Sequence, residues 1–279
     1  MSDSNVGVRD IVRGLREIGL TQDSRVIVHA SLSSFGPVRG GAVAVLAGLL
    51  STCDTVVMPA FTYQALVWPL TGPPDNGVSY GQADHVESNR NAIFFHLRLP
   101  IHRDVGVIPE RLRQHPATLR SAHPALSFVA VGSQAQAALA GQTLDQPLAP
   151  IEWLQHHDGD VLLIGVGHTR NTSIHFAEKL ANRKQFVRWA IIRDGDSVTV
   201  RAVRLPNFPG CSDGFDAIEP EIASKTTQVT IGNALVRRVP LRMLIPIVVG
   251  WISDEPEALL CTRPGCERCN AVRHAGRPG

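Results

Sequence analysis

The apolar and polar positions of the chain form a succession of helix-like and strand-like patterns. Residues 8–18 carry apolar side chains near the 3.6-residue period, which predicts an amphipathic helix. The apolar run at 26–29 predicts a strand, residues 42–50 a helix, and residues 55–58 a second strand that ends at Pro59. A strand, a helix and a strand in this order predict a βαβ unit with a right-handed crossover.

The rest of the chain continues this mixture. Residues 68–91 are rich in Pro, Gly, Asp and Asn, and we interpret them as an ordered surface excursion that forms one wall of a cleft. Asp194 and Gly195 form a dipeptide favoured in tight hairpins, so residues 186–192 and 198–203 are predicted to pair antiparallel. Further strands are expected at 125–131 and 161–166, helices at 110–114, 134–139 and 174–183, and mixed elements at 217–223, 227–231 and 241–251. The pattern predicts an α/β protein.

Length and composition limit the class of protein. The chain has 279 residues, 44% of them hydrophobic, which is enough for a sizeable core. Its net charge of +2 comes from 27 basic and 25 acidic side chains spread through the sequence, so a nucleic-acid role is disfavoured. No apolar run reaches the roughly 18 residues that span a bilayer, and the first residues lack the apolar region of a signal peptide. We therefore expect a cytoplasmic protein without a membrane partner, with one domain over 1–260 and a short Cys- and Arg-containing tail over 261–279.

The segment 165–178 carries the strongest indication of chemistry. An apolar run precedes it, Gly165 and Gly167 end that run, and the residues that follow are predicted to be helical. His175 and Glu178 are three residues apart and share a helix face, where a carboxylate fixes the tautomer of an imidazole and raises its basicity. A general base near neutral pH needs this pairing, and the alternative is an ordinary exposed ion pair.

Two other residues of this segment allow more than one interpretation. Thr172 lies one turn before His175 and either caps the helix or stabilises a developing oxyanion. His168 is either a polar residue at the end of a strand or a member of the site. The spacing differs from His-Glu-x-x-His, so a metal-dependent hydrolase is disfavoured.

Two polar stretches elsewhere are candidate ligand-binding segments. The loop 31–41 joins a strand to a helix, where N–H groups and hydroxyls can hold a phosphate or an extended polar chain. It matches no nucleotide-binding motif, so a plain connection is the alternative. A second stretch places four carboxylates around Phe215, at Asp213, Asp216, Glu219 and Glu221. These carboxylates, with Asp84 and Glu87 of the excursion, either form solvated surface or pair with the ammonium groups of a polyamine or an amino sugar.

The cysteines favour a reducing compartment. Five cysteines are an odd number, and three of them are crowded near the end of the chain, which does not resemble a secreted disulfide framework. Cys261, Cys266, Cys269 and His274 have the order C-x4-C-x2-C-x4-H, which is a possible zinc site. Reduced thiols are the expectation for a cytoplasmic protein, and we assign no metal at this point.

Several short blocks, taken in order over roughly residues 8–252, resemble the aminoglycoside 3-N-acetyltransferase family. The blocks are residues 28–36, Gly40 with Gly41, 57–62, 106–110, 120–124 and 165–178. The last block contains Gly-Val-Gly-His-x-x-Asn-Thr-Ser-x-His-x-Ala-Glu, which makes the resemblance specific. The resemblance implies a three-layer α/β/α fold of the antibiotic N-acetyltransferase type, with a central mixed sheet. Acetyl-CoA would be the cosubstrate, and the acceptor would be the 3-amino group of a 2-deoxystreptamine antibiotic, so that the enzyme confers resistance.

The resemblance also implies roles for particular residues. His175 would be the base in a direct transfer, Glu178 would orient it, and Thr172 would lie near the thioester. The residues implied at the coenzyme are His29, Ser31, Ser33, Ser34, Phe35, Gly36, Val38 and Arg39. Those implied at the aminoglycoside are Asp84, Glu87, His168, Asp213, Phe215 and Asp216. The alternatives are an N-acetyltransferase for another small amine and a non-catalytic coenzyme-binding protein, either as a monomer or as a homodimer.

Overall fold

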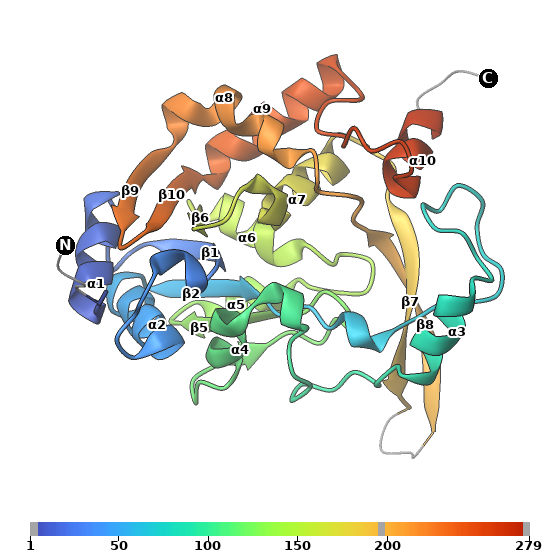
Figure 1. Ribbon diagram of the computed structural model, residues 1–279, viewed down its shortest axis with the longest axis horizontal. Helices are drawn as coiled ribbons and strands as arrows, with labels where there is room; N and C mark the ends of the chain where they lie inside the picture. The colour runs from blue at the N-terminus through green and yellow to red at the C-terminus, as the bar shows by residue number, and fades with distance from the viewer. Residues whose placement is uncertain (1–4, 195–198, 276–279) are drawn as a thin grey trace.

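A seven-stranded mixed sheet forms the centre of the protein in the computed structural model, which describes residues 5–194 and 199–275 (Figure 1). Its strand order is β4-β5-β2-β1-β6-β10-β9. The strands are β1 (Arg25–Ala30), β2 (Thr55–Pro59), β4 (Leu119–Arg120), β5 (Phe128–Gly132), β6 (Asp160–Ile164), β9 (Thr227–Ile231) and β10 (Ala234–Pro240). Strand β1 pairs in parallel with both β2 and β6, whereas β5 and β10 join the sheet antiparallel. The predicted parallel pair at 26–29 and 55–58 is confirmed.

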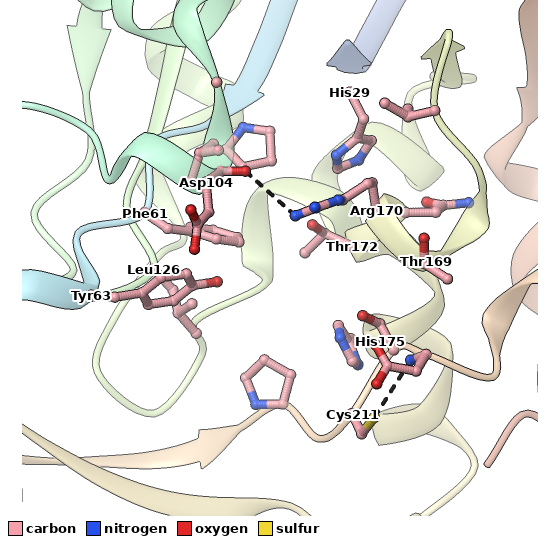
Figure 2. Close-up of a pocket in the computed structure, with 18 of the residues that line it drawn as sticks. His29, Phe61, Tyr63, Asp104, Leu126, Thr169, Arg170, Thr172, His175 and Cys211 are labelled. Atoms are coloured by element: carbon pink, nitrogen blue, oxygen red, sulfur yellow. Dashed lines mark hydrogen bonds between the residues drawn. The ribbon is translucent and has the colours of Figure 1, made fainter. Parts of the chain in front are cut away.

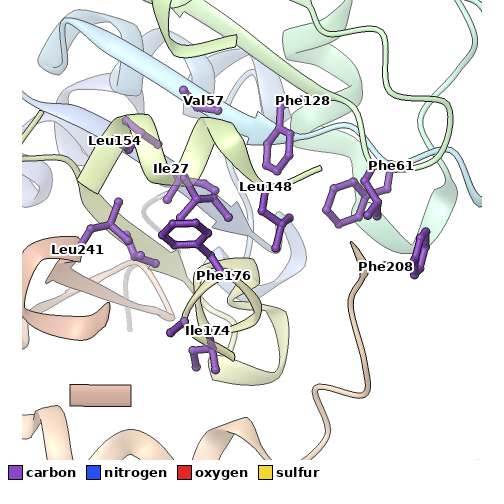
Figure 3. Packing of buried hydrophobic residues seen from close by; sticks show 14 of the residues in the cluster. Ile27, Val57, Phe61, Phe128, Leu148, Leu154, Ile174, Phe176, Phe208 and Leu241 are labelled. Carbon is purple, nitrogen blue, oxygen red and sulfur yellow. The ribbon is translucent and has the colours of Figure 1, made fainter. Parts of the chain in front are cut away.

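Helices cover both faces of this sheet because its strands are apolar on both sides. The helices are α1 (Val8–Glu17), α2 (Gly41–Thr52), α3 (Ala83–Arg90), α4 (Val107–Arg113), α5 (Ala135–Ala140), α6 (Ala149–His156), α7 (Thr172–Leu180), α8 (Glu219–Ile222), α9 (Leu241–Asp254) and α10 (Glu267–Ala275). On one face, Val26 and Val28 of β1 pack with α1, α2 and α4. On the other face, Ile27 packs with α5, α6, α7 and α9 (Figure 3). These two cores confirm the three-layer α/β/α fold.

A second, three-stranded sheet extends from one side of the main body (Figure 1). It consists of β3 (Leu66–Val67), β7 (Phe186–Arg193) and β8 (Val200–Phe208), and β7 pairs antiparallel with both neighbours. The predicted antiparallel pair is therefore confirmed, although Gly195 of its predicted turn lies outside the described residues. Phe186 and Leu205 are buried in the same core as α7, so this sheet is anchored to the main body.

The structure also contains elements that the sequence patterns did not predict. Helix α6 and strand β10 were not expected, and α3 is a helix within the excursion at 68–91. The short helix expected at 110–114 begins earlier, at Val107, and α7 begins at Thr172. In the tail, α10 packs against the body through Ala271, which is 4% exposed. Within the two described ranges, every helix is too short or too polar to cross a membrane.

Candidate active site

A cavity of about 1700 Å³ opens where the parallel strands end. Its walls include Ala30 at the end of β1 and Ser31 after it, Phe61 after β2, and Gly165 and Val166 after β6. In α/β sheets this edge is the usual place for a ligand, because loops from neighbouring strands leave the sheet together. Figure 2 shows side chains from several separate segments directed into this space.

The pairing of β1 with β6 brings two of the predicted segments together. Ala30 is in register with Ile164, so the loop from Ser31 and the turn at Gly165 start side by side. Gly165 has a φ of 62°, and a Cβ atom at this position would lie 1.8 Å from the hydroxyl oxygen of Ser34. A side chain at residue 165 would therefore displace the Ser31 loop, which explains why glycine occurs there.

Helix α7 carries the candidate base into the cavity. Asn171 caps the helix, since its side-chain oxygen accepts a hydrogen bond from the N–H of Ser173 at 3.1 Å. Thr172 is therefore the first helical residue rather than the cap, and both Thr172 and His175 line the cavity. Figure 2 places both side chains between His29 on one side and Cys211 on the other.

Two buried side chains hold the imidazole of His175, Glu178 by direct contact and Arg183 through Glu178. Its Nδ1 lies 2.7 Å from Oε2 of Glu178, and Oε1 of Glu178 accepts a hydrogen bond from Arg183 Nη1 at 2.9 Å. The Glu178 and Arg183 side chains are 4% and 3% exposed. Arg183 Nη2 also donates to the carbonyls of Pro256 and Ala258, at 2.8 and 2.7 Å. The carboxylate that orients the imidazole is thus fixed by a guanidinium that is itself fixed to the backbone.

This arrangement determines which nitrogen of His175 faces a ligand. An ionised carboxylate only accepts hydrogen bonds, so Nδ1 carries the hydrogen toward Glu178 and Nε2 remains for the cavity. The ring of Phe215 packs against the imidazole, with centroids 4.7 Å apart and planes at 62°. Phe215 is fully buried, so it supports the base from behind instead of lining the cavity.

The predicted coenzyme residues divide into two groups. Those that line the cavity are His29, Ser31, Ser33, Gly36 and Val38. Ser34, Phe35 and Arg39 do not line it. Ser34 donates its hydroxyl hydrogen to the Ser31 carbonyl at 2.7 Å, and Phe35 is 1% exposed in the core. Arg39 is exposed and lies beside Gly7.

The predicted acceptor residues are more scattered. Asp213 lines the cavity and forms an ion pair with Arg263. Asp84 and Glu87 lie on the exposed surface of α3, away from the cavity lining. Asp216 accepts a hydrogen bond from the N–H of Thr169 at 3.2 Å, which holds the turn before α7.

His168 lies beneath the site and not in its wall. It is fully buried, and its Nε2 is 3.1 Å from a carboxylate oxygen of Glu219, which also pairs with Arg237 at 3.1 Å. Its Nδ1 is 3.2 Å from Nδ2 of the Asn171 side chain. Burial is the main cause that lowers the pKa of His168. The geometry therefore places His168 as a link between the turn before α7, α8 and β10.

Sequence patterns missed several residues of the cavity wall. They are Phe61, Tyr63, Asp104, Gly106, Val107, Arg170, Arg188, Phe208, Glu267 and Arg268. Some of these residues could have been found from the sequence, since Gly106 and Val107 begin one of the blocks that resemble the family. No sequence pattern pointed to Arg188, which lies in strand β7. It is buried among Trp68, Phe186 and Phe208, and its guanidinium carbon is 5.5–5.8 Å from their ring centroids.

Two buried histidines make stability depend on pH. Burial, followed by the charge of His168, lowers the pKa of His29 to about 3, and burial lowers the pKa of His123 to about 4. Both imidazoles take up a proton on unfolding at mildly acidic pH. Their contribution to the free energy of unfolding is therefore fully present above 6.5, the pKa of histidine in the unfolded chain, and decreases as the pH falls below it. Each group adds a slope of about 1.4 kcal/mol per pH unit between its two pKa values.

We expect a His123→Asn variant to lose part of this dependence. The Nδ1 of His123 accepts hydrogen bonds from the N–H groups of Ala125 and Leu126, at 3.3 and 3.0 Å, and an Asn side-chain oxygen can accept them instead. Urea unfolding at pH 7, 6 and 5 should give a smaller decrease in unfolding free energy for the variant than for the wild type. Equal decreases would contradict this account.

Comparisons with known proteins point to one family. The model of the aminoglycoside 3-N-acetyltransferase family matches residues 27–253. The chain is 26% identical to aminoglycoside N(3)-acetyltransferase IV of Salmonella sp over 88% of this chain and 87% of that protein. It is 30% identical to aminoglycoside N(3)-acetyltransferase VII of Streptomyces paromomycinus over 79% of this chain and 77% of that protein. The solved structure of AAC-IIIb with CoASH is similar with a TM-score of 0.75 and 25% identity, over 90% of this chain and 97% of that chain.

Proposed function

The chain belongs to the aminoglycoside 3-N-acetyltransferase family, and from this premise we propose that it transfers acetyl from acetyl-CoA to the 3-amino group of 2-deoxystreptamine antibiotics and so confers resistance. It is an acyltransferase, and acetyl-CoA is its cosubstrate. The observation that carries the proposal is the imidazole of His175, which opens into the cavity and is oriented by Glu178 and Arg183.

The chemistry requires a base at this position. An aliphatic ammonium has no free electron pair, so it must lose a proton before its nitrogen can attack the thioester carbon. This first proton passes to solvent. As the neutral amine attacks and the nitrogen–carbon bond forms, Nε2 of His175 accepts a second proton from the nitrogen. The tetrahedral intermediate then collapses, the carbon–sulfur bond breaks, and coenzyme A leaves as the thiolate. The proton held by the imidazole can pass to this sulfur, which restores the neutral base.

The start of α7 supplies a group for the charge that develops on oxygen. Thr172 lines the cavity one turn before His175, and the positive end of the helix dipole lies at the same residue. We assign the hydroxyl of Thr172 to the thioester oxygen, because a positioned donor stabilises an oxyanion more than the neutral carbonyl of the ground state.

The two substrates would approach His175 from opposite sides. The Ser31 loop and the start of α4 form the side near His29, where an extended polar chain such as pantetheine has hydroxyls and N–H groups to bind. The opposite side is the one where Figure 2 places Cys211. Asp213 lies there, with its N–H 3.5 Å from Cys211 Sγ, and so does Glu267, which follows Cys266. The Asp213 pair with Arg263 is solvent-exposed and therefore weak, so a substrate ammonium can replace the guanidinium.

The activity is tested by following thiol release from acetyl-CoA with gentamicin or neomycin as the acceptor. We expect release that depends on the aminoglycoside, and a product heavier by one acetyl group at the 3-amino position. A set of unrelated small amines serves as the comparison. Release that stays at background with every 2-deoxystreptamine compound, or that is faster with the unrelated amines, would refute the substrate assignment.

A further inference from the structure

Four of the five cysteines converge at the edge of the cavity. Cys211 follows β8, and Cys261, Cys266 and Cys269 belong to the C-terminal segment. Their sulfur atoms all lie within 4.8 Å of one another. The four side chains are 9% exposed or less and form a small core of their own with Leu260. We propose that these four thiolates bind a structural zinc ion.

The arrangement fits a tetrahedral zinc site. Zinc–sulfur bonds of about 2.3 Å place the sulfurs of a tetrahedral site roughly 3.8 Å apart, so the observed cluster needs only a small contraction. Cys266 and Cys269 form a Cys-x-x-Cys pair at the beginning of α10, a common source of two zinc ligands. All four cysteines are free thiols in the structure. Soft thiolate ligands select zinc over magnesium or calcium.

The surroundings of the sulfurs agree with a negatively charged centre. The N–H of Asp213 is directed at Cys211 Sγ at 3.5 Å, and the N–H of Cys261 is directed at Cys269 Sγ at 3.4 Å. The guanidinium of Arg263 lies 3.9 Å from Cys211 Sγ. A zinc ion with four thiolates has a net charge of −2, and donors of this kind both orient its ligands and offset that charge.

The fourth ligand differs from the one that spacing suggested. The order C-x4-C-x2-C-x4-H pointed to His274, but this residue is exposed near the end of α10 and does not belong to the sulfur cluster. Cys211 occupies the fourth position instead, from a segment that lies 50 residues earlier than Cys261. Sequence spacing cannot find such a ligand, because the fold and not the local chain brings it into place.

The proposed metal has a defined mechanical role. Cys211 and Cys266 both line the cavity, and Arg268 donates to the Gly210 carbonyl at 2.9 Å. Figure 1 shows α10 at the end of the β7 and β8 ribbon. Zinc would therefore fasten the C-terminal segment to the loop after β8 and fix the wall that faces the acceptor. Four protein ligands leave no open position, so the ion would take no part in acetyl transfer.

Metal analysis of the untagged, full-length protein tests the proposal. We expect about one zinc per chain in the wild type and less than about a tenth of this in Cys211→Ser, because a tetrathiolate site loses most of its affinity with one ligand. Cys53→Ser is the matched control, since Cys53 is equally buried but lies at the end of α2. Cys53→Ser and His274→Ala should both retain the ion.

Measurements on the wild type keep the test decisive if Cys211→Ser does not fold. Cobalt substituted for zinc should show the sulfur-to-metal charge-transfer bands of a tetrahedral tetrathiolate site, and a chelator should release the zinc and lower the melting temperature. Native protein without zinc whose thiols are all free or paired as disulfides would overturn the proposal. Zinc that persists in Cys211→Ser but is lost in His274→Ala would overturn the ligand set. None of these readouts depends on acetyltransferase activity.

Discussion

A His175→Asn variant is expected to acetylate aminoglycosides at least about 10²-fold more slowly than the wild type, because the imidazole that lines the cavity is the group we propose to remove the proton of the acceptor amine. Asn keeps a polar side chain near Phe215 and Glu178 but cannot act as a base at neutral pH. The loss should appear in kcat with acetyl-CoA at saturation. The Kd of coenzyme A should remain close to that of the wild type, because the Ser31 loop is unchanged.

His156→Asn is a suitable control for this experiment. His156 is an exposed histidine at the end of α6 and does not line the cavity. Its replacement should leave kcat unchanged. If His175→Asn turned over at a rate near that of the wild type, another group would have to be the base, and the role assigned to His175 would be wrong.

Replacement of Glu178 should have the second largest effect on the rate. In Glu178→Gln the amide can still accept the hydrogen bond from Nδ1 of His175, but the negative charge that favours the imidazolium is lost. The base then holds a proton less firmly, and we expect kcat/KM to fall roughly 10-fold to 10²-fold. The acid limb of the kcat/KM profile should move to lower pH. The variant should also melt at a lower temperature, because Arg183 is left as a buried, unpaired cation.

The pH profile separates a positioning role from a structural one. A purely structural defect would reduce activity in proportion to the fraction of folded protein and would leave the acid limb where it is. Glu87→Gln provides the matched control, since Glu87 is an exposed carboxylate on α3 away from the cavity. An acid limb that coincides in Glu178→Gln and the wild type would show that Glu178 does not act through the imidazole.

Local patterns were sufficient for much of the fold and for the candidate base. The βαβ unit that begins at Arg25, the antiparallel pair of β7 with β8 and the helix that carries His175 all follow from apolar periodicity and turn residues within short windows. The His175 and Glu178 contact follows from helix geometry alone, because residues three apart meet on one face.

The remaining features depend on contacts between distant segments. Arg183 reaches Glu178 across the end of α7, and its other partners are carbonyls more than 70 residues away. The sequence also could not show which carboxylates line the cavity. Asp213 and Asp216 are three residues apart, but of the two only Asp213 lines the cavity, because Asp216 accepts a hydrogen bond from Thr169 in the turn before α7. Strand β10 has an irregular polar pattern, and its place in the sheet comes from pairing with β6 and β9.

The proposed base and the proposed acceptor wall rest on different parts of the molecule. His175 is held by α7 and the main core, whereas the wall opposite it is built from the loop after β8 and the segment 261–275. Selection for new antibiotics can therefore reshape the wall without disturbing the proton-transfer machinery. Arg183 limits these changes at one place, because it donates hydrogen bonds to the carbonyls of Pro256 and Ala258. An insertion just before Cys261 would move these carbonyls, disturb the Arg183 contact with Glu178, and so be expected to lower the catalytic rate. The segment that follows the β8 loop sets a second limit, because Phe215 packs against the imidazole and Asp216 holds the turn at Thr169.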